Sequence, residues 1–377
     1  NNFISGKGYM IRVADNWSST VASSYNGQFV GQPNNGLITQ NIGIGYNLIG
    51  NPYPSPINAD TFLLNNSSVS TLYFWTNTTP ASGGVYPQNN FASYTTLGGA
   101  AAFASAVIPN EFIQTGQGFY ISSSTANDIN FSNDLRENAS VSTQFFRTSN
   151  ASNSIVEKHR IWLNLNDANA SYNQILIGYM DGATAGLDNS IDGKILDDSK
   201  PILYSVLNSE KLVIQGKGMP FDNNDIVPLG LKVLTPGTYT ISLENVDGLF
   251  VNQNIYLKDN FTNTIHDIKQ SAYTFATQDG TFNNRFEVVY SNSVLGNDDF
   301  VNENAITVYT NQNSIVVNTK ETISEVVVFD VLGRRLFSQN DLDTEEVVIS
   351  KIVKSNQALF IKTTLSNGQV ITKKVVY

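Results

Sequence analysis

The chain has 377 residues, of which 41% are hydrophobic and 14% charged, and its net charge is −10. Such a length exceeds what one hydrophobic core normally serves, so we expect two or three domains. The chain contains no cysteine, which excludes disulfides, thiolate metal ligands and a cysteine nucleophile. The acidic balance disfavours contacts with phosphate backbones, so no nucleic acid is expected among the partners. No run of about 18 apolar residues predicts a membrane-spanning helix.

A short motif occurs twice in the first third of the chain. Residues 6–11 (GKGYMI) resemble residues 116–121 (GQGFYI), and each copy has the pattern of a turn that enters an alternating strand. We therefore expect a β-rich repeat module over residues 1–140 with an incomplete first unit and a complete unit from roughly Gly45 to Arg136. On this interpretation, the beginning of the first unit lies upstream of Asn1.

Short apolar or alternating runs between Asn, Asp and Gly clusters continue through the middle of the chain. The clearest are residues 160–165, 174–179, 238–243 and 254–259. This pattern is typical of antiparallel strands and predicts a jelly-roll-like β-sandwich over residues 143–291. The polar stretch 292–303 predicts a linker.

The last segment, residues 304–377, predicts about seven short strands and an immunoglobulin-like sandwich. The expected fold class is therefore all-β, with tandem β-sandwich modules that end in this domain. Asn367-Gly368 between two apolar runs predicts a two-residue hairpin loop.

That loop sets an expected register in which Lys362 faces Lys373 and Phe360 faces Val375. The expected core side of the hairpin consists of Leu359, Ile361, Leu365, Val370 and Val376. Like charges directly opposite each other destabilise a strand pair. The lysines therefore suggest either a solvated basic face that discourages edge aggregation or a surface that a partner recognises.

Residues 326–335 (VVVFDVLGRR) resemble the VxVYDxxGRxV signature of type A sorting domains in type IX secretion cargo of Bacteroidota. The segments 359–362, 367–368 and 372–376 resemble the closing hairpin and basic end of that family. Two departures are Ala358, where the family often has Gly, and Tyr377, where it often has Lys or Arg.

The resemblance implies a signal that the type IX translocon recognises at the outer membrane, handover to an outer-membrane shuttle barrel, and cleavage with attachment to surface lipopolysaccharide. The residues that match the family's motifs are Asp330, Gly333, Arg334, Lys362, Gly368, Lys373 and Lys374. The implied location is secreted, on the outer cell surface.

Residues 45–55 (GYNLIGNPYPS) resemble a segment of large surface proteins from the same bacteria, many of which glide. Physically, Asn51 to Pro56 predicts a rigid turn after a strand. We therefore expect the upstream modules to be stalk or adhesion domains of an adhesin-like protein. The alternatives are accessory modules of an extracellular hydrolase and a calcium-dependent carbohydrate-binding module.

Signals for catalysis are weak. The chain has two histidines, His159 and His266, and no zinc-protease, nucleophile-elbow or nucleotide-binding motif. The sequence offers a Ser-His-Asp arrangement through His266 and Asp267 and, among its many carboxylates, a glycosidase pair. No acidic pair stands in a context that indicates burial and a raised pKa, and we expect no enzyme activity.

Two kinds of binding site remain open. Asp188 and Asp192 lie in Gly-rich loops and are candidate calcium ligands, although Asp-Gly pairs also form ordinary turns. No other cofactor is expected. Tyr73-Phe74-Trp75 could present an aromatic ring to a sugar, or its alternate rings could belong to the core.

Overall fold

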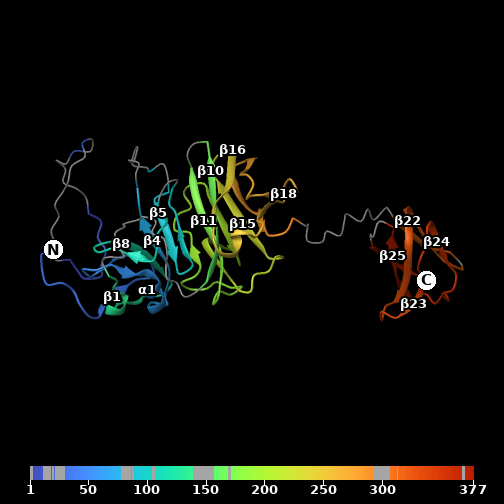
Figure 1. Cartoon of the computed structure of the whole chain (residues 1–377), viewed down its shortest axis with the longest axis horizontal. Helices are drawn as coiled ribbons and strands as arrows, with labels where there is room; N and C mark the ends of the chain where they lie inside the picture. Colours follow the sequence, from blue (N-terminus) through green and yellow to red (C-terminus); the bar gives the residue numbers. More distant parts are fainter. Residues whose placement is uncertain are drawn as a thin grey trace. The chain divides into compact units, whose positions relative to one another are not determined.

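The computed structural model describes residues 3–11, 18, 21, 30–77, 86, 89–103, 107–138, 157–168, 171–292, 306–311, 313–366 and 370–377. The chain divides into two compact units, Asn1–Asn292 and Ser293–Tyr377. Strands dominate both units, which confirms the expected all-β class (Figure 1). No described helix has the length and hydropathy that a membrane span requires.

The first part of unit 1 is built on a five-stranded sheet in the order β2-β8-β4-β5-β6, with the small pairs β1-β9 and β3-β7 beside it. Its elements are β1 (Ile38–Ile42), β2 (Gly45–Gly50), β3 (Ile57–Asn58), α1 (Ala59–Asn65), β4 (Val69–Trp75), β5 (Phe91–Thr95), β6 (Gly98–Ala100), β7 (Phe112–Ile113), β8 (Gly118–Ser123), β9 (Asn127–Phe131) and the 3₁₀ turn η1 (Asn133–Leu135). Helix α1 has no signal in the hydrophobic periodicity. Asn58 caps it by accepting a hydrogen bond from the Thr61 N–H at 2.9 Å, and Phe62 packs into the core.

The repeated glycine motif occupies both edges of β2. On one edge, the Gly8 N–H donates to the Leu48 carbonyl and the Gly50 N–H donates to the Gly6 carbonyl. On the other edge, Gly118 at the start of β8 pairs with Gly50. A Cβ atom on Gly8 would lie 2.6 Å from the Ile49 carbonyl oxygen, so the close approach requires glycine. The two copies of the motif therefore play related structural roles.

The chain leaves β2 through the corner at Asn51 to Pro56 that the sequence predicts. The Asn51 amide donates to the carbonyls of Ser55, Ile113 and Gln114, and its Oδ1 accepts from the Tyr53 N–H. Because this buried side chain uses both of its polar ends, it fixes the corner against β7.

The second part of unit 1 is a curled sheet in the order β18-β17-β20-β15-β13-β14-β11-β10-β16-β19, with β12 on β14. Its elements are β10 (Lys158–Asp167), β11 (Tyr172–Met180), β12 (Gly193–Lys194), β13 (Ile202–Leu207), β14 (Glu210–Gly218), β15 (Ile226–Val233), β16 (Gly237–Val246), the 3₁₀ turn η3 (Gly248–Val251), β17 (Tyr256–Asp259), β18 (Thr264–Asp267), β19 (Tyr273–Thr277) and β20 (Gly280–Val289). The four runs singled out in the sequence lie largely in β10, β11, β16 and β17. Inward side chains of these strands form the largest core of the chain.

The two parts of unit 1 pack against each other, although each keeps a core of its own. The Trp162 indole N–H donates to the Gly99 carbonyl at 2.8 Å, and the Arg160 guanidinium donates to the Leu97 carbonyl at 3.1 Å. Leu97 and Trp162 also share a small apolar cluster with residues of β11 and β14. The predicted boundary between residues 140 and 143 lies outside the described residues.

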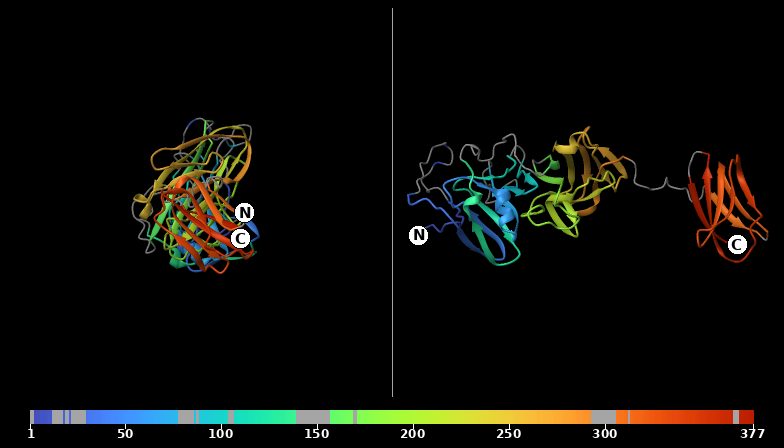
Figure 2. Two further views of the ribbon diagram at one scale, coloured as in Figure 1. Left: turned by 90° about the vertical axis from the view of Figure 1, so that its right-hand side faces the viewer. Right: turned by 60° about the horizontal axis from the view of Figure 1, so that its bottom comes forward.

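Unit 2 contains six strands among its described residues, where the sequence predicts about seven. They are β21 (Ile306–Thr310), β22 (Ile315–Asp330), β23 (Arg335–Gln339), β24 (Thr344–Ile349), β25 (Ala358–Leu365) and β26 (Val370–Val376), coloured orange to red in Figure 2. The 16-residue strand β22 pairs with β21 and β24 through its first half and with β23 and β25 through its second half. This strand is long, whereas the sequence predicts only short strands in this segment. Nearly all of the predicted linker lies outside the described residues.

The predicted register of the closing hairpin is wrong by one residue. Lys362 faces Thr372, Lys373 faces Ile361, and the last pair before the turn is Thr364 with Val370. A two-residue loop at Asn367-Gly368 would give a different pairing, and these two loop residues lie outside the described part of the chain.

The shift moves β26 side chains to the opposite face of the sheet. Val370 and Val376, which we expected in the core, are exposed, and Ile371 is buried instead. Leu359, Ile361 and Leu365 are buried as predicted. The two exposed lysines of the outward face are Lys362 and Lys374, on neighbouring strands.

We expect each unit to unfold in its own thermal transition. Ile361 is fully buried in unit 2, so Ile361→Ala should destabilise that unit by about 2–5 kcal/mol. The matched variant Ile177→Ala, in the core of unit 1, should lower the other transition only. Differential scanning calorimetry checks both, and a single transition lowered by either variant would contradict two independent units.

Candidate functional site

The two motifs that the sequence places at the end of the chain lie together in unit 2. The pairing joins Asp330 to Leu359 and Phe329 to Phe360 across β22 and β25, and Phe360 to Lys374 across β25 and β26. The turn that follows β22 is thus at the same end of the sheet as the basic end of β26. The two motifs are therefore neighbours in the folded unit, although about 25 residues separate them in the sequence.

Asp330 organises the turn between β22 and β23. Its side chain is 3% exposed, and its Oδ1 accepts hydrogen bonds from the N–H groups of Leu332 and Arg334, both at 2.9 Å. Its Oδ2 accepts from the Arg334 Nε at 2.7 Å. Gly333 has φ +77°, a conformation that side chains with a Cβ rarely adopt. Asp, Gly and Arg of the motif are therefore all used to build one rigid turn.

The charge state of Asp330 follows from these contacts. Burial acts to raise the pKa of this carboxyl. The hydrogen bonds from the Arg334 N–H and side chain and from the Leu332 N–H outweigh burial and hold the pKa below 3.8. Asp330 is therefore a stable anion at neutral pH, and the mostly exposed Arg334 covers it.

The remaining residues of the predicted recognition set are distributed along the same sheet. Lys374 and Lys362 are exposed on the outward face, whereas Lys373 is half-buried opposite Ile361. Gly368 lies outside the described residues. The structure thus brings Asp330, Gly333, Arg334 and Lys374 to one end of the unit, with Lys362 one row along the sheet.

Asp188 and Asp192, the candidate calcium ligands, occupy one loop of unit 1. Both oxygens of Asp188 accept hydrogen bonds from Thr184, through its N–H and its hydroxyl. The oxygens of Asp192 accept from the N–H groups of Asp188 and Gly216, each at 2.7 Å. Within the described ranges, no group of three or more acidic or histidine side chains could hold a metal ion. These carboxylates act as caps that fix the loop.

Both histidines make local structural contacts. The Nδ1 of His159 accepts from the Leu249 N–H at 3.1 Å, and the ring is buried. The Nε2 of His266 lies 2.8 Å from the Ser271 carbonyl, while the Asp267 carboxylate accepts from the Lys269 N–H. Asp267 therefore orients the following turn, and the His266 ring is held by Ser271.

Aromatic residues on the five-stranded sheet divide between core and surface. Tyr73 and Phe74 are buried, whereas Trp75 is 41% exposed. Trp75 packs edge to face against Phe91 at 5.1 Å, and Phe91 packs against Tyr120 at 5.7 Å. An aromatic strip therefore crosses β4, β5 and β8 on one face.

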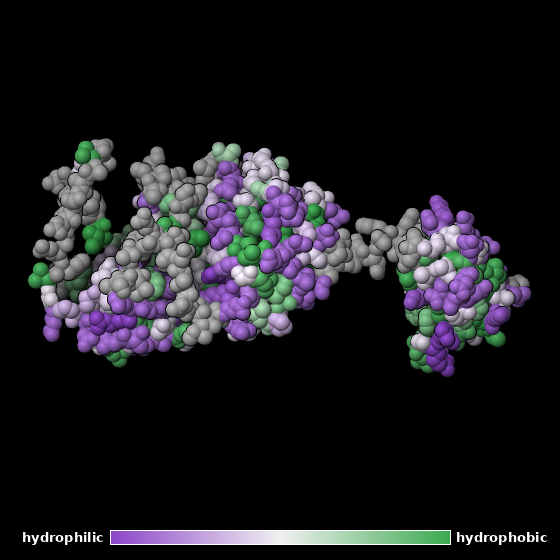
Figure 3. All heavy atoms as spheres, in the orientation of Figure 1, coloured by the Kyte–Doolittle hydropathy of each residue, from purple (hydrophilic) through white to green (hydrophobic). Residues whose placement is uncertain are grey.

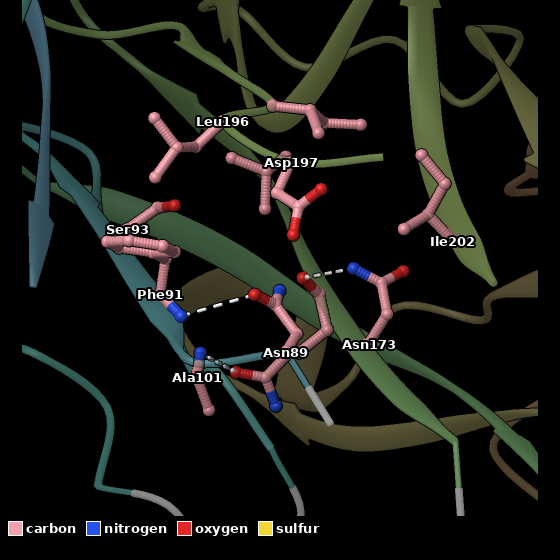
Figure 4. Close-up of a pocket in the computed structure, with 11 residues that line it drawn as sticks. Asn89, Phe91, Ser93, Ala101, Asn173, Leu196, Asp197 and Ile202 are labelled. Carbon is pink, nitrogen blue, oxygen red and sulfur yellow. Dashed lines mark hydrogen bonds between the residues drawn. The ribbon is translucent and has the colours of Figure 1, made fainter. Parts of the chain in front are cut away.

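Two cavities of unit 1 differ greatly in size. The pocket in Figure 4, lined by Asn89, Asn173 and Asp197 among others, holds about 20 Å³, which suffices for one water molecule. A cleft of about 460 Å³ lies beside the repeated glycine turns, with Phe3, Tyr9 and Tyr53 in its wall. The repeated turns were the sequence signal for this region, but the cleft itself depends on the packing of segments far apart in the chain.

Asp192 provides a test of the loop. Burial raises its pKa to about 6, from 3.8, so its contribution to stability is complete below about pH 4 and is lost as the pH rises through 6. The difference between these two pKa values corresponds to roughly 3 kcal/mol in the free energy of unfolding. At about pH 4, where Asp192 is protonated, Asp192→Asn should lower the free energy of unfolding by about 1–3 kcal/mol, because the amide NH2 group cannot accept from one of the two N–H donors. The variant should also lack the pH dependence of the parent chain. Chemical denaturation of both proteins from about pH 4 to pH 7 measures the difference.

Calcium should leave the melting temperature of the chain unchanged, because N–H and O–H donors already occupy the oxygens of both carboxylates. A calcium-induced rise in melting temperature that Asp188→Asn abolishes would contradict this assignment and would favour the calcium site.

Comparisons with known proteins follow the division into units. Family models match residues 1–290, as Domain of unknown function (DUF8693), and residues 295–377, as Domain of unknown function (DUF8694). None of the curated proteins matches the chain. Among solved structures, Tp47, the 47-kilodalton lipoprotein of Treponema pallidum, is similar over 85% of this chain and 90% of that chain, with 9% identity and a TM-score of 0.18. So low a TM-score carries no argument about fold or function. The chain belongs to the family described as Domain of unknown function (DUF8693), whose model spans nearly all of unit 1.

Proposed function

We propose that unit 2 is a secretion signal of the type IX class, and that unit 1 is a stalk or adhesion module of the surface protein that it delivers. The partners on this proposal are the type IX translocon and its outer-membrane shuttle barrel, with attachment to surface lipopolysaccharide after cleavage. The protein would then act outside the cell, at the outer surface.

The turn at Asp330 is the single observation that carries the proposal. A motif that served only the core would need only its apolar residues. Here Asp330, Gly333 and Arg334 hold an exposed turn in one conformation. A rigid, exposed turn loses little conformational entropy when a partner binds it, which favours recognition of the folded domain.

The outward face of β25 and β26 supports the same interpretation. Lys362 and Lys374 are exposed on it, and Phe360 lies directly opposite Lys374. Basic and apolar groups side by side suit a partner surface that is acidic and partly apolar. In Figure 3, hydrophobic residues lie beside hydrophilic ones on the visible face of unit 2.

A second candidate function concerns unit 1. The strip formed by the exposed Trp75 and the half-buried Phe91 and Tyr120 favours carbohydrate binding, because aromatic rings with a free face pack on the apolar faces of sugars. This activity would suit an adhesion module or an accessory module of a hydrolase. Trp75→Ala should then abolish retention on an insoluble polysaccharide, and Tyr309→Ala, an exposed ring of unit 2, is the matched control.

Loss of export provides one test of the signal. Deletion of residues 356–377 removes β25 and β26, which pair with β22 and cover the core, so the truncated chain should remain inside a bacterium with a type IX system. Normal secretion of the truncated chain would refute the proposal.

Charge reversal provides a finer test. Lys362→Glu with Lys374→Glu should reduce export several-fold and leave the free energy of unfolding within about 1 kcal/mol of the parent value, because both side chains are exposed. The matched control is Lys320→Glu with Lys351→Glu, two exposed lysines outside the motifs. Equal export of both double variants would exclude the lysine face as the recognised surface.

A further inference from the structure

Four exposed apolar side chains gather at the end of unit 2 where β22 finishes. Val331, Leu332, Val353 and Val376 are 60–84% exposed, and we call them the apolar tip. Val331 and Leu332 belong to the Asp330 turn, and Val353 belongs to the segment before β25. Val376 faces Ala358 at the start of β25. Three separate segments thus contribute apolar side chains to this end of the unit.

The register and local hydrogen bonds bring these segments together. Asp330 pairs with Leu359, which places the turn beside the start of β25. The Tyr377 carbonyl accepts hydrogen bonds from the Ser355 and Gln357 N–H groups, which holds the end of β26 against the segment before β25. The Tyr377 ring is buried in the core, and the Lys354 ammonium lies 5.6 Å from its centre. The tip is therefore supported by a fixed backbone.

Basic residues surround the apolar tip. Arg334 and Arg335 follow Leu332 in the turn, Lys354 follows Val353, and Lys374 precedes Val376 by two residues. All four are exposed. The only acidic side chain in these segments is Asp330, which is buried against Arg334. The end of the unit thus combines exposed apolar groups with three bases, Arg335, Lys354 and Lys374, beyond the Asp330–Arg334 ion pair.

Acidic residues collect at the opposite end of the same sheet. Strand β23 runs from Arg335, opposite Phe329, to Gln339, opposite Val326, so the following loop lies away from the tip. That loop contains Asp341 and Asp343, and its Leu342 N–H donates to the Ser324 carbonyl. Glu325, Glu345 and Glu346 lie beside it in the register. Unit 2 therefore has basic residues at one end of its strands and acidic residues at the other.

We propose that the apolar tip binds the surface of a bilayer that contains acidic phospholipids. Its side chains project from the surface, and none of them lines a pocket among those found in the described residues. A protrusion of this kind suits insertion between lipid headgroups, and the ring of bases complements their phosphates. The acidic end would be repelled by the same surface, so the field orients the tip toward the membrane.

This proposal concerns the surface that also carries the proposed secretion signal, but it requires no secretion machinery. Co-sedimentation of the purified full chain with vesicles of phosphatidylcholine, with and without phosphatidylglycerol, tests it. We expect binding to the acidic vesicles, weak binding to the neutral ones, and loss of binding at high salt.

Two double variants separate the contributions. Lys354→Gln with Lys374→Gln should weaken binding roughly 25-fold, about fivefold for each base. Leu332→Ser with Val353→Ser should weaken it roughly tenfold or more at unchanged charge. The matched controls are Lys320→Gln, and Val348→Ser on β24, whose side chain is 54% exposed. Both controls should bind like the parent chain, and circular dichroism checks that every variant is folded.

Equal binding to neutral and acidic vesicles, no binding to either, or undiminished binding of the tip variants would overturn the proposal. Capture of an acidic protein that requires the tip, without vesicle binding, would also overturn it. Vesicle binding that persists while export fails would count against the secretion signal alone, so the two proposals fail separately.

Discussion

The architecture of unit 2 depends on one buried carboxylate. Asp330 ends the 16-residue strand β22, and its two oxygens accept three hydrogen bonds from the turn that follows. The turn reverses the chain into β23, while the same end of β22 pairs with β25, which in turn carries β26. The contacts of Asp330 therefore fix the turn residues of the proposed signal, and the strand pairing that starts at the same end of β22 places its lysines. A buried acceptor without its donors would be costly, which makes this turn a strict constraint on the sequence.

The chain is divided into two compact units with separate cores. Unit 1 joins two β-rich parts through contacts such as Trp162 to Gly99 and Arg160 to Leu97, so it behaves as one body with two cores. Unit 2 has its own core, which closes around Tyr377. A unit that folds on a core of its own accords with the proposal of a transferable signal.

Sequence patterns predicted what depends on local chemistry. The alternation of strands and the corner at Asn51 follow from propensity and turn preferences, and the structure contains both. The predicted register of β25 and β26 is wrong, because it was inferred from Asn367-Gly368 alone. A shift of one residue exchanges the two faces of β26. The roles of Asp188 and Asp192 were also beyond local reasoning. Their donors include the Gly216 N–H, which only the folded sheet brings near. The apolar tip was missed for the same reason, since three distant segments form it.

The most direct test of the account is a gain of function. A reporter protein fused to residues 293–377 would be expressed in a bacterium with a type IX system and in a mutant of the same strain that lacks the translocon. The account predicts that the reporter reaches the medium or the cell surface only in the competent strain. Retention of a folded reporter fusion in both strains would contradict the central claim that unit 2 is the secretion signal.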